Sequence, residues 1–495
     1  MKGLRNIFAL AFMLSSLAAS AQHWLPFNTL VHDAEDQVSP TAFLGRFTSS
    51  WNDASVGVDL RREDSAFLPQ EGNGKLEGFF NYGTYVRFGN GSAARGGARY
   101  SRGVKRDVIW NSTSDFSILY PYVMADSLEC DLQSEQYSFN GYYATRARKF
   151  VLGGGAQYRA LHEYRDFDPR PRNITSDLKV SASAGYPVKS YLLDLSASFR
   201  KYYQNQALTF YNKKGANTNE FQFLGLGAHY PRFEGSENFY RTYYKGFGWS
   251  AALSMRPADG ADGWSSALSL ASLSLKRRLP ILNNAVLCEL NTLNADIFTS
   301  LRNTKGRVRH NTLLKAGYEH RQGIEPLLDS KSGSDFGSLL DVEMYTADIL
   351  SGSIESVIEF PREKGTLALN PSASAYSFSS GYVYPERKMD FAYAEAGAGA
   401  SYRSMAGKLA YYIGAEALYK VNLGGSLDIP SEFTQELIAA HYGGMHAAFT
   451  DNCLSAGLNA RIKYGICYLS LSYRRLFFGS GNGTDCLCSA LGLEF

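Results

Sequence analysis

Apolar and polar residues alternate along long stretches of this chain, with a repeat of two residues. In Leu178–Val188 the even positions are mainly apolar, and the odd positions hold lysine, serine, glycine and proline. The same pattern occurs in Leu76–Phe88, Tyr191–Phe199 and Leu409–Val421. Such a segment needs an apolar surrounding on one side and a polar one on the other, which is the pattern of a half-buried β-strand.

The length and composition of these segments favour a membrane barrel over a soluble sandwich. Soluble strands average about five or six residues, whereas these run for about ten or more, as tilted membrane strands must. Their apolar faces are rich in alanine, glycine and tyrosine, which suits a wall facing lipid. Tyr186 and Tyr191 flank a tight turn, as in the aromatic girdle of a membrane interface. We therefore predict an all-β fold, an antiparallel transmembrane β-barrel.

The number of strands is predicted less closely. Candidate strands can be marked along the whole chain, 21 in all, and they include segments 116–124, 219–230 and 433–449. Bacterial single-chain barrels usually have an even number of strands, so at least one candidate is not a barrel strand. We predict about 18 strands, with 16 to 20 open.

Loop lengths predict which end of the barrel faces outward. Outer loops are long and periplasmic turns are short. Glu163–Ile174 and Gln204–Asn217 are long, with Lys189 at a tight turn between them, so we expect the first two outside and Lys189 inside. Gln322–Gly337 then falls on the wrong side, which places an error in the strand assignment between residues 280 and 380.

The N-terminus has the features of a secretory signal peptide. Lys2 and Arg5 precede an apolar run, Ile7–Leu17, and the small residues Ala19-Ser20-Ala21 follow. The run is too short to span a bilayer, and the pattern is that of a cleaved signal. We predict a signal peptide over residues 1–21, a short N-terminal segment over 22–50 that can plug the lumen, and a barrel over 51–495.

The end of the chain resembles the C-terminal signature of outer-membrane barrels, in which Phe495 would be read by the barrel-insertion machinery. The chain also resembles the uncharacterised outer-membrane β-barrel proteins of about this size found in Bacteroidota. That resemblance rests on the signal peptide, on the pair Met389–Arg403 and Gly407–Val421 after Gly381–Arg387, and on Gly492–Phe495. It implies a barrel in the outer membrane of a Gram-negative cell, surrounded by outer-membrane lipids. It implies no catalytic pattern.

Charge and motifs exclude several function classes. Removing residues 1–21 removes two of the 50 Lys and Arg and none of the 47 Asp and Glu, which leaves a net charge of +1. A nucleic-acid partner would need a concentrated basic face. The eight histidines are scattered and no metal-ligand spacing occurs, so we expect neither a metal nor a cofactor. The six cysteines allow 15 pairings, among which the sequence does not choose.

Polar side chains predicted to face the lumen are the candidate functional residues. Such charges can form a ladder that narrows the pore, or they can line a water-filled path. The predicted lumen-lining residues are Glu77, Arg87, Arg95, Arg99, Asp194, Arg200, Glu416 and Lys420. Because Arg87, Arg95 and Arg99 are predicted to face the interior from adjacent strands, we expect an open channel to favour anions weakly.

A channel or transporter for a small solute is the favoured function, because about 18 strands enclose more space than side chains alone can fill. The alternative is a non-conducting scaffold of an uptake complex that docks a lipoprotein or a second barrel through long outer loops. A membrane-embedded hydrolase is less favoured, with His162, Glu163, Asp166 and Asp168 as its candidates. We therefore do not expect an enzyme.

Overall fold

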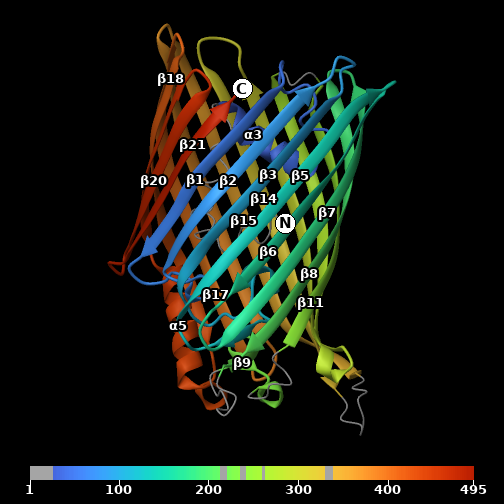
Figure 1. Cartoon of the computed structure of the whole chain (residues 1–495), viewed down its shortest axis with the longest axis vertical. Coiled ribbons are helices and arrows are strands. Elements are labelled where there is room, and N and C mark those ends of the chain that lie inside the picture. The colour runs from blue at the N-terminus through green and yellow to red at the C-terminus, as the bar shows by residue number, and fades with distance from the viewer. Residues whose placement is uncertain (1–25, 212–219, 235–240, 259–261, 329–337) are drawn as a thin grey trace.

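The wall of the molecule is one closed antiparallel sheet (Figure 1). The computed structural model describes residues 26–211, 220–234, 241–258, 262–328 and 338–495. The predicted signal peptide over residues 1–21 lies outside these described residues. Among the described residues, 18 strands form the sheet, and it closes because β1 pairs with both β2 and β21. The prediction of an 18-stranded antiparallel barrel is therefore confirmed.

The strands of the wall are long, and each pairs with its neighbours in the sheet. They are β1 (Trp51–Glu63), β2 (Gly74–Arg87), β3 (Ala93–Val108), β5 (Cys130–Ala147), β6 (Phe150–Tyr164), β7 (Arg170–Val188), β8 (Tyr191–Thr209), β11 (Arg241–Pro257), β12 (Gly263–Leu279), β13 (Ala285–Asn303), β14 (Arg309–Leu328), β15 (Ser338–Arg362), β16 (Gly365–Tyr382), β17 (Arg387–Ala406), β18 (Leu409–Asp428), β19 (Cys453–Tyr464), β20 (Cys467–Phe478) and β21 (Gly483–Glu494).

Shorter elements lie before the wall or between its strands. The helices are α3 (Pro26–Val38), α4 (Phe116–Leu119) and α5 (Glu436–Thr450), and the single turns of 3-10 helix are η2 (Pro69–Glu71), η3 (Pro231–Phe233), η5 (Pro280–Leu282) and η6 (Ser431–Phe433). The short strands β4 (Met124–Asp126), β9 (Glu220–Gly225) and β10 (Ala228–His229) form a separate sheet of their own. No helix in the described part of the chain is both long enough and apolar enough to cross a bilayer.

The two-residue alternation places apolar side chains on the outside of the wall. On β1, Val56 and Val58 are 54% and 45% exposed, whereas Asp53 and Ser55 on the other face are buried. The same arrangement recurs around the barrel, where most exposed large apolar residues lie on the outer faces of strands. A soluble protein rarely exposes a continuous apolar band of this size, and closed barrels with such a band span outer membranes. The chain is an outer-membrane β-barrel.

The two ends of the barrel differ in their connections. Short turns at 88–92, 148–149, 189–190, 363–364 and 407–408 lie at the end where β1 begins and β21 ends, which is the upper end in Figure 1. Longer connections, with β4, β9 and α5, lie at the lower end. Because barrels of this kind have short periplasmic turns, we assign the upper end to the periplasm and the lower end to the outside.

Three of the 21 candidate strands are not strands of the wall. Segment 116–124 contains α4 and part of β4, segment 219–230 contains β9 and β10, and segment 433–449 is largely α5. Both faces of β9 are buried, so alternation could not show that it lies inside the barrel. In α5 the buried residues recur every three or four positions, which is a helical repeat. The prediction of a strand over 433–449 was therefore wrong.

The misassigned segment 219–230 also explains the error in loop parity. Without it, Leu328 and Ser338, which pair across the β14–β15 connection, lie at the same end as residues 165–169. The error therefore lies before residue 280 and not between 280 and 380. The first predicted long loop is shorter than expected, because β6 extends through Tyr164 and β7 begins at Arg170. The second is part of a longer connection, because β8 ends at Thr209 and the next wall strand, β11, begins at Arg241.

Candidate functional site

The described N-terminal residues 26–50, here called the N-terminal segment, lie inside the periplasmic half of the barrel (Figure 1). Helix α3 contacts the inner faces of β12, β14 and β15. Its residues Ala34 and Val38 pack against Ala252, Phe298 and Leu313 of the wall. Burial of these apolar groups holds the helix against one side of the lumen.

Asp194 on β8 anchors the segment where α3 ends. Its two carboxylate oxygens accept hydrogen bonds from Ser39 Oγ at 2.7 Å and Thr41 Oγ1 at 2.6 Å. Arg256 on β11 donates to the backbone oxygen of Thr41 at 2.9 Å. Asp194 is fully buried, and a buried carboxylate is costly unless such donors surround it. Buried polar residues of the wall therefore bind this segment directly.

A second polar anchor joins the N-terminal segment to β3. Asp36 contacts Arg46 of the same segment at 2.8 Å and also pairs with Arg95 of the wall. Burial acts to raise the pKa of Asp36, but the two guanidinium groups outweigh it and hold that pKa well below the usual range. Asp36 is therefore ionised at neutral pH. The predicted lumen-lining residue Arg95 therefore binds this segment.

Gly153 makes room for the same segment on β6. A Cβ atom at this position would lie 2.7 Å from Thr41 Cγ2 and 3.2 Å from the backbone of Pro40. Real Cβ atoms do not approach other atoms that closely without a shift of the neighbour. Glycine at position 153 therefore serves close packing against Pro40 and Thr41.

The outer half of the lumen is filled by residues 109–126 and 220–230, together called the outer insert. The strands β4 and β9 of the insert pair with each other, with Met124 opposite Gln222. Its aromatic residues Trp110, Phe221 and Phe223 are buried in one apolar cluster that includes inward-facing residues of the wall. The insert is therefore a packed core inside the barrel and not a flexible loop.

Buried arginines fix the outer insert to its surroundings. Arg165, in the β6–β7 connection, contacts both carboxylate oxygens of Asp126 at 3.0 Å and donates to the carbonyl of Asn111 at 3.1 Å. Arg321 on β14 donates to the carbonyl of Tyr120 at 3.0 Å, and Arg387 on β17 donates to the carbonyl of Leu226 at 3.0 Å. Guanidinium groups suit such sites because they offer several fixed donors.

Helix α5 covers the outer insert at the external end of the barrel. Its buried residues Ile438, Tyr442 and Met445 join the same apolar cluster. His441 stacks on Trp110 with ring centres 4.9 Å apart, and its Nε2 lies 2.8 Å from Nε2 of Gln70. The outer closure thus combines η2, the outer insert and α5.

We expect the packing of α5 to weaken with acid. Burial lowers the pKa of His441 to about 3, whereas a released histidine titrates near 6.5. The stabilisation is therefore complete above about pH 6.5 and is lost as the pH falls toward 3. At pH 5 the docking of α5 should be weaker by about 2 kcal/mol than at pH 7.5.

Hydrogen exchange of the amides of Glu436–Thr450, corrected for intrinsic rates, measures this change. His441→Gln should remove the extra opening at pH 5, and His446→Gln on the same helix serves as the control that retains it. An identical pH response in the His441→Gln protein would show that another group is responsible.

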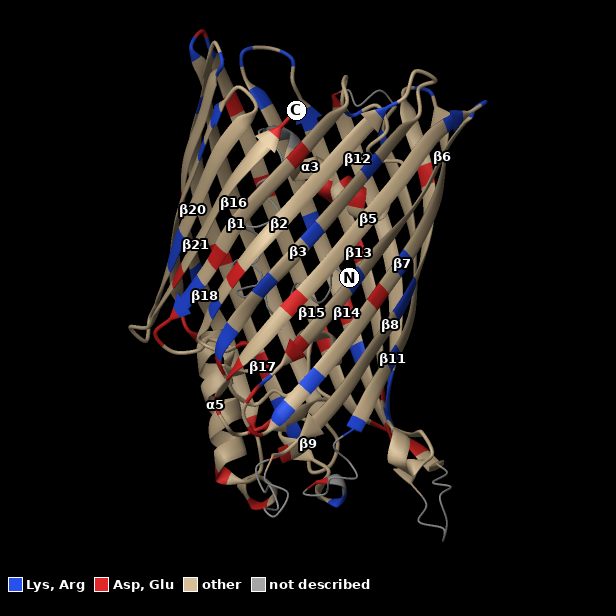
Figure 2. Cartoon of the chain, viewed as in Figure 1, with Lys and Arg blue, Asp and Glu red and all other residues tan. Residues whose placement is uncertain are grey.

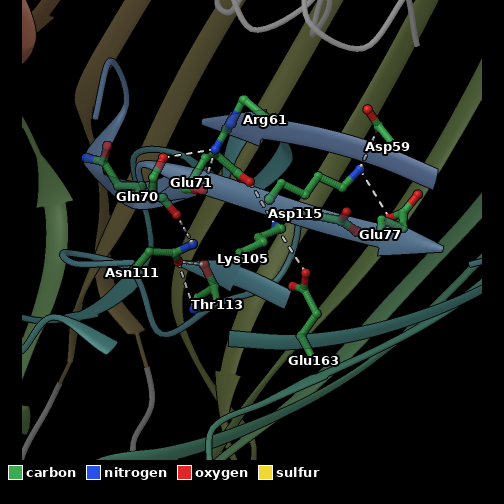
Figure 3. Close-up of polar contacts among 12 residues, drawn as sticks. Asp59, Arg61, Gln70, Glu71, Glu77, Lys105, Asn111, Thr113, Asp115 and Glu163 are labelled. Atoms are coloured by element: carbon green, nitrogen blue, oxygen red, sulfur yellow. Dashed lines mark hydrogen bonds and ion pairs between the residues drawn. The ribbon is translucent and has the colours of Figure 1, made fainter. Parts of the chain in front are cut away.

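Charged residues form a ladder along the inner faces of β1, β2 and β3 (Figure 3). Lys75 lies between Asp59 and Glu77, at 3.4 Å and 3.1 Å. Lys105 lies between Glu71 of η2 and Glu163 of β6, at 2.8 Å and 3.1 Å. The ladder continues to the outer insert, because Asn111 donates to the carbonyl of Gln70 at 3.1 Å. Charges of both signs are therefore paired on this side of the lumen, and Figure 2 shows both kinds interspersed along the strands of the barrel.

Comparison with known proteins places the chain in a family. The model of a family of unknown function, DUF6850, matches residues 40–495. The chain belongs to this family. The predicted resemblance to an uncharacterised family agrees with this match, while the Bacteroidota source stays a prediction. No curated protein matches this DUF6850 member.

Several solved outer-membrane receptors are similar to this DUF6850 chain at low identity. The ferric enterobactin receptor PfeA of Pseudomonas aeruginosa, solved with BCV-L6, is 8% identical, with a TM-score of 0.39, covering 91% of this chain and 82% of that one. The siderophore receptor PirA of Acinetobacter baumannii is 6% identical, with a TM-score of 0.39, and the match covers 91% of this chain and 81% of that one. The alcaligin receptor FauA of Bordetella pertussis is 10% identical, with a TM-score of 0.34, and the match covers 90% of this chain and 76% of that one.

The predicted lumen-lining residues of this DUF6850 member all lie on inner faces of the wall, and each has a contact. Glu77 pairs with Arg99 at 2.9 Å, Arg200 with Asp177 at 2.7 Å, and Glu416 with Arg474. Lys420 donates to the carbonyl of Phe449 at 3.0 Å, and Arg87 to that of Thr48 at 3.0 Å. Arg87, Arg95 and Arg99 therefore bind separate partners, which weakens the case for a shared anion-attracting wall.

The candidate hydrolase residues do not come together. Glu163 faces the lumen and pairs with Lys105, whereas His162 lies on the outer face and accepts a hydrogen bond from Arg172 at 3.2 Å. Asp168, in the β6–β7 connection, pairs with Arg170 at the start of β7. Within the described ranges, no cluster of three or more His, Cys, Asp or Glu side chains is placed to hold a metal ion.

The sequence did not single out the arginines that fix the outer insert. Arg277, Arg321 and Arg387 are among the largest fully buried side chains. Each lies on the inward face near the external end of its strand. An arginine at an inward position of this kind was the signal in the sequence that could have identified them. Phe495, predicted to be read during insertion, is 60% exposed, and its backbone pairs with Asn52. Its role in assembly stays a prediction.

Proposed function

We propose that this barrel is a gated outer-membrane transporter for a small polar solute, closed at rest at both ends. The N-terminal segment forms the periplasmic gate, and the outer insert with α5 forms the external closure. A barrel of 18 strands encloses more space than its own side chains fill. Here the additional space is occupied by segments that are separate from the wall.

The observation that carries this proposal is the way in which the N-terminal segment is held. Its polar contacts with the wall centre on Asp194, Arg256 and Arg95. Each such hydrogen bond contributes only about 0.5–1.5 kcal/mol net, or about 1.5–3 when charged, because water replaces it on release. The segment can therefore leave without breaking a strand pair, as a gate must.

The character of the lumen wall supports a polar solute. Partly exposed charges of both signs, including Arg99, Glu77 and Lys75, line its inner face between the two closures. An apolar solute would have to desolvate these groups, which is costly. A small hydrophilic solute would meet donors and acceptors along the same path.

Conductance in planar bilayers tests the gate. One variant carries Asp36→Ala and Asp194→Ala, a second has residues 110–125 replaced by a short glycine-serine linker, and a third combines both changes. We expect no steady conductance from the parent protein. The combined variant should give a steady ohmic conductance at least ten times the residual conductance of the parent. The reason is that only the third variant has lost a contact set at each end of the lumen.

Two controls make the result decisive. Glu359→Gln changes a buried wall carboxylate that pairs with Arg403, and it should leave conductance unchanged. In the double aspartate variant, amides of residues 29–44 should exchange at least tenfold faster than in the parent. A folded combined variant without conductance, or unchanged exchange, contradicts the gate. The non-conducting scaffold that docks a lipoprotein or second barrel would then take its place.

A further inference from the structure

Three lysines lie side by side on the outer face of the barrel, on the adjacent strands β8, β11 and β12. Lys245 is directly opposite Lys276 in the β11–β12 pair. Lys201 is opposite Phe247, so it is a diagonal neighbour of Lys245. Directly opposed side chains have Cβ atoms about 5 Å apart, and like charges in that arrangement destabilise a sheet. A bound anion would therefore stabilise this arrangement of three ammonium groups.

The lysines lie between an apolar and an aromatic layer. On β8 the outward sequence is Phe199, Lys201, Tyr203, and on β11 it is Tyr243, Lys245, Phe247. The two phenylalanine rings are in contact, with centres 4.5 Å apart, and both are about half exposed. The Nζ atom of Lys245 lies 5.1 Å from the ring centre of Tyr243. Its chain therefore extends away from the phenylalanines and toward the external end.

The position of the lysines along the strand matches the edge of a membrane. Tyr191 begins β8 at the periplasmic end, and Lys201 follows ten residues later. At about 3.3 Å per residue and a tilt of about 40°, those ten residues span roughly 25 Å of height. That is the usual height of the apolar band of an outer-membrane barrel. The lysines therefore lie where the headgroups of the outer leaflet begin.

The positive charge of this group is only partly compensated by the protein. Lys276 pairs with Glu289 at 3.0 Å. In the described part of the chain, neither Lys201 nor Lys245 forms an ion pair with an acidic side chain. Both are exposed on the lipid-facing side, where an unpaired ammonium gains most from an anionic group at the same depth.

We propose that Lys201, Lys245 and Lys276 bind the phosphorylated headgroup of a glycolipid in the outer leaflet. A phosphate between the three ammonium groups accepts charge-assisted hydrogen bonds from them. The acyl chains of the same lipid then cover Phe199, Phe247 and Leu195, which are exposed directly below. A free phosphate satisfies only the first of these two surfaces, so the structure assigns the site to a lipid.

Native mass spectrometry of the purified barrel in detergent tests the proposal. The probe is a bis-phosphorylated lipid A disaccharide, compared with its dephosphorylated form. Each basic residue near an anionic lipid surface contributes about fivefold in affinity, so Lys201→Gln with Lys245→Gln should weaken binding about 30-fold. The dephosphorylated lipid should bind the parent and the variant equally.

A matched lysine and a free anion complete the test. Lys388 also points outward at the external end of its strand but pairs with Glu386, so Lys388→Gln should bind like the parent. Inorganic phosphate at millimolar concentration should not displace the lipid. Equal binding by the double variant overturns the proposal, and so does displacement by inorganic phosphate. Heat-modifiable migration of each variant confirms that the barrel is folded.

Discussion

Replacing Arg165 by methionine is expected to destabilise the outer closure by about 3–5 kcal/mol, because it leaves Asp126 buried without its cation. Both side chains are fully inaccessible to solvent, and Arg165 also donates to the carbonyls of Val108 and Asn111. Urea unfolding of the purified barrel in detergent, followed by hydrogen exchange of residues 109–126, measures the loss. The wall strands should keep their protection while the outer insert loses it.

The origin of this loss can be separated from the pair itself. Burial raises the pKa of Asp126 in spite of Arg165, so the carboxylate is costly to bury even when it is paired. Arg165→Met with Asp126→Leu should therefore recover most of the stability, since no charge remains buried. Arg106→Met breaks an exposed ion pair with Asp131 and should change stability by less than about 1 kcal/mol. A similar loss in both single variants would contradict the argument.

Gly153→Val is expected to displace the N-terminal segment from the wall and leave the barrel itself assembled. Its new side chain would occupy the space of Thr41 Cγ2 and the Pro40 backbone, and overpacking of this kind costs about 1–3 kcal/mol. Valine suits a strand, so β6 itself should not suffer. Limited proteolysis within residues 38–46 should become at least tenfold faster.

The neighbouring glycine provides the control for this change. Gly154 faces outward, and a Cβ there would meet only Ser181 O at 3.6 Å, an ordinary contact. Gly154→Val should therefore leave the N-terminal segment protected. Equal proteolysis of the two variants, or protection in both, would mean that the close approach at Gly153 does not hold the segment.

The wall of the barrel could be predicted because each strand shows a local alternation of apolar and polar residues. Val56 faces lipid and Ser55 faces the lumen, and each position carries that information in its own polarity. The pattern survives without knowledge of any distant contact. Alternation thus predicts a strand and its two faces, and an even strand number then follows from closure.

The contents of the lumen could not be predicted in the same way. Asp194 was expected at the lumen, but its partners Ser39 and Thr41 are more than 150 positions away. Arg321 reaches Tyr120 across 201 positions. Such contacts depend on how a segment enters the closed barrel. The short-range alternation of apolar and polar residues does not indicate them. Segment 219–230 shows the difficulty, because β9 is a real strand whose pairing partner is β4 and not the wall.

The pairing of β1 with β21 has a consequence for biosynthesis. Val56 and Leu491 are neighbours in the closed sheet although 435 positions separate them in the chain. The two free edges, each a row of unpaired backbone groups prone to aggregate, must therefore be shielded from other chains until the last strand has been exported. The N-terminal segment precedes every strand. A cell that makes this protein would build the wall around it, and would not need to thread it into a finished cylinder.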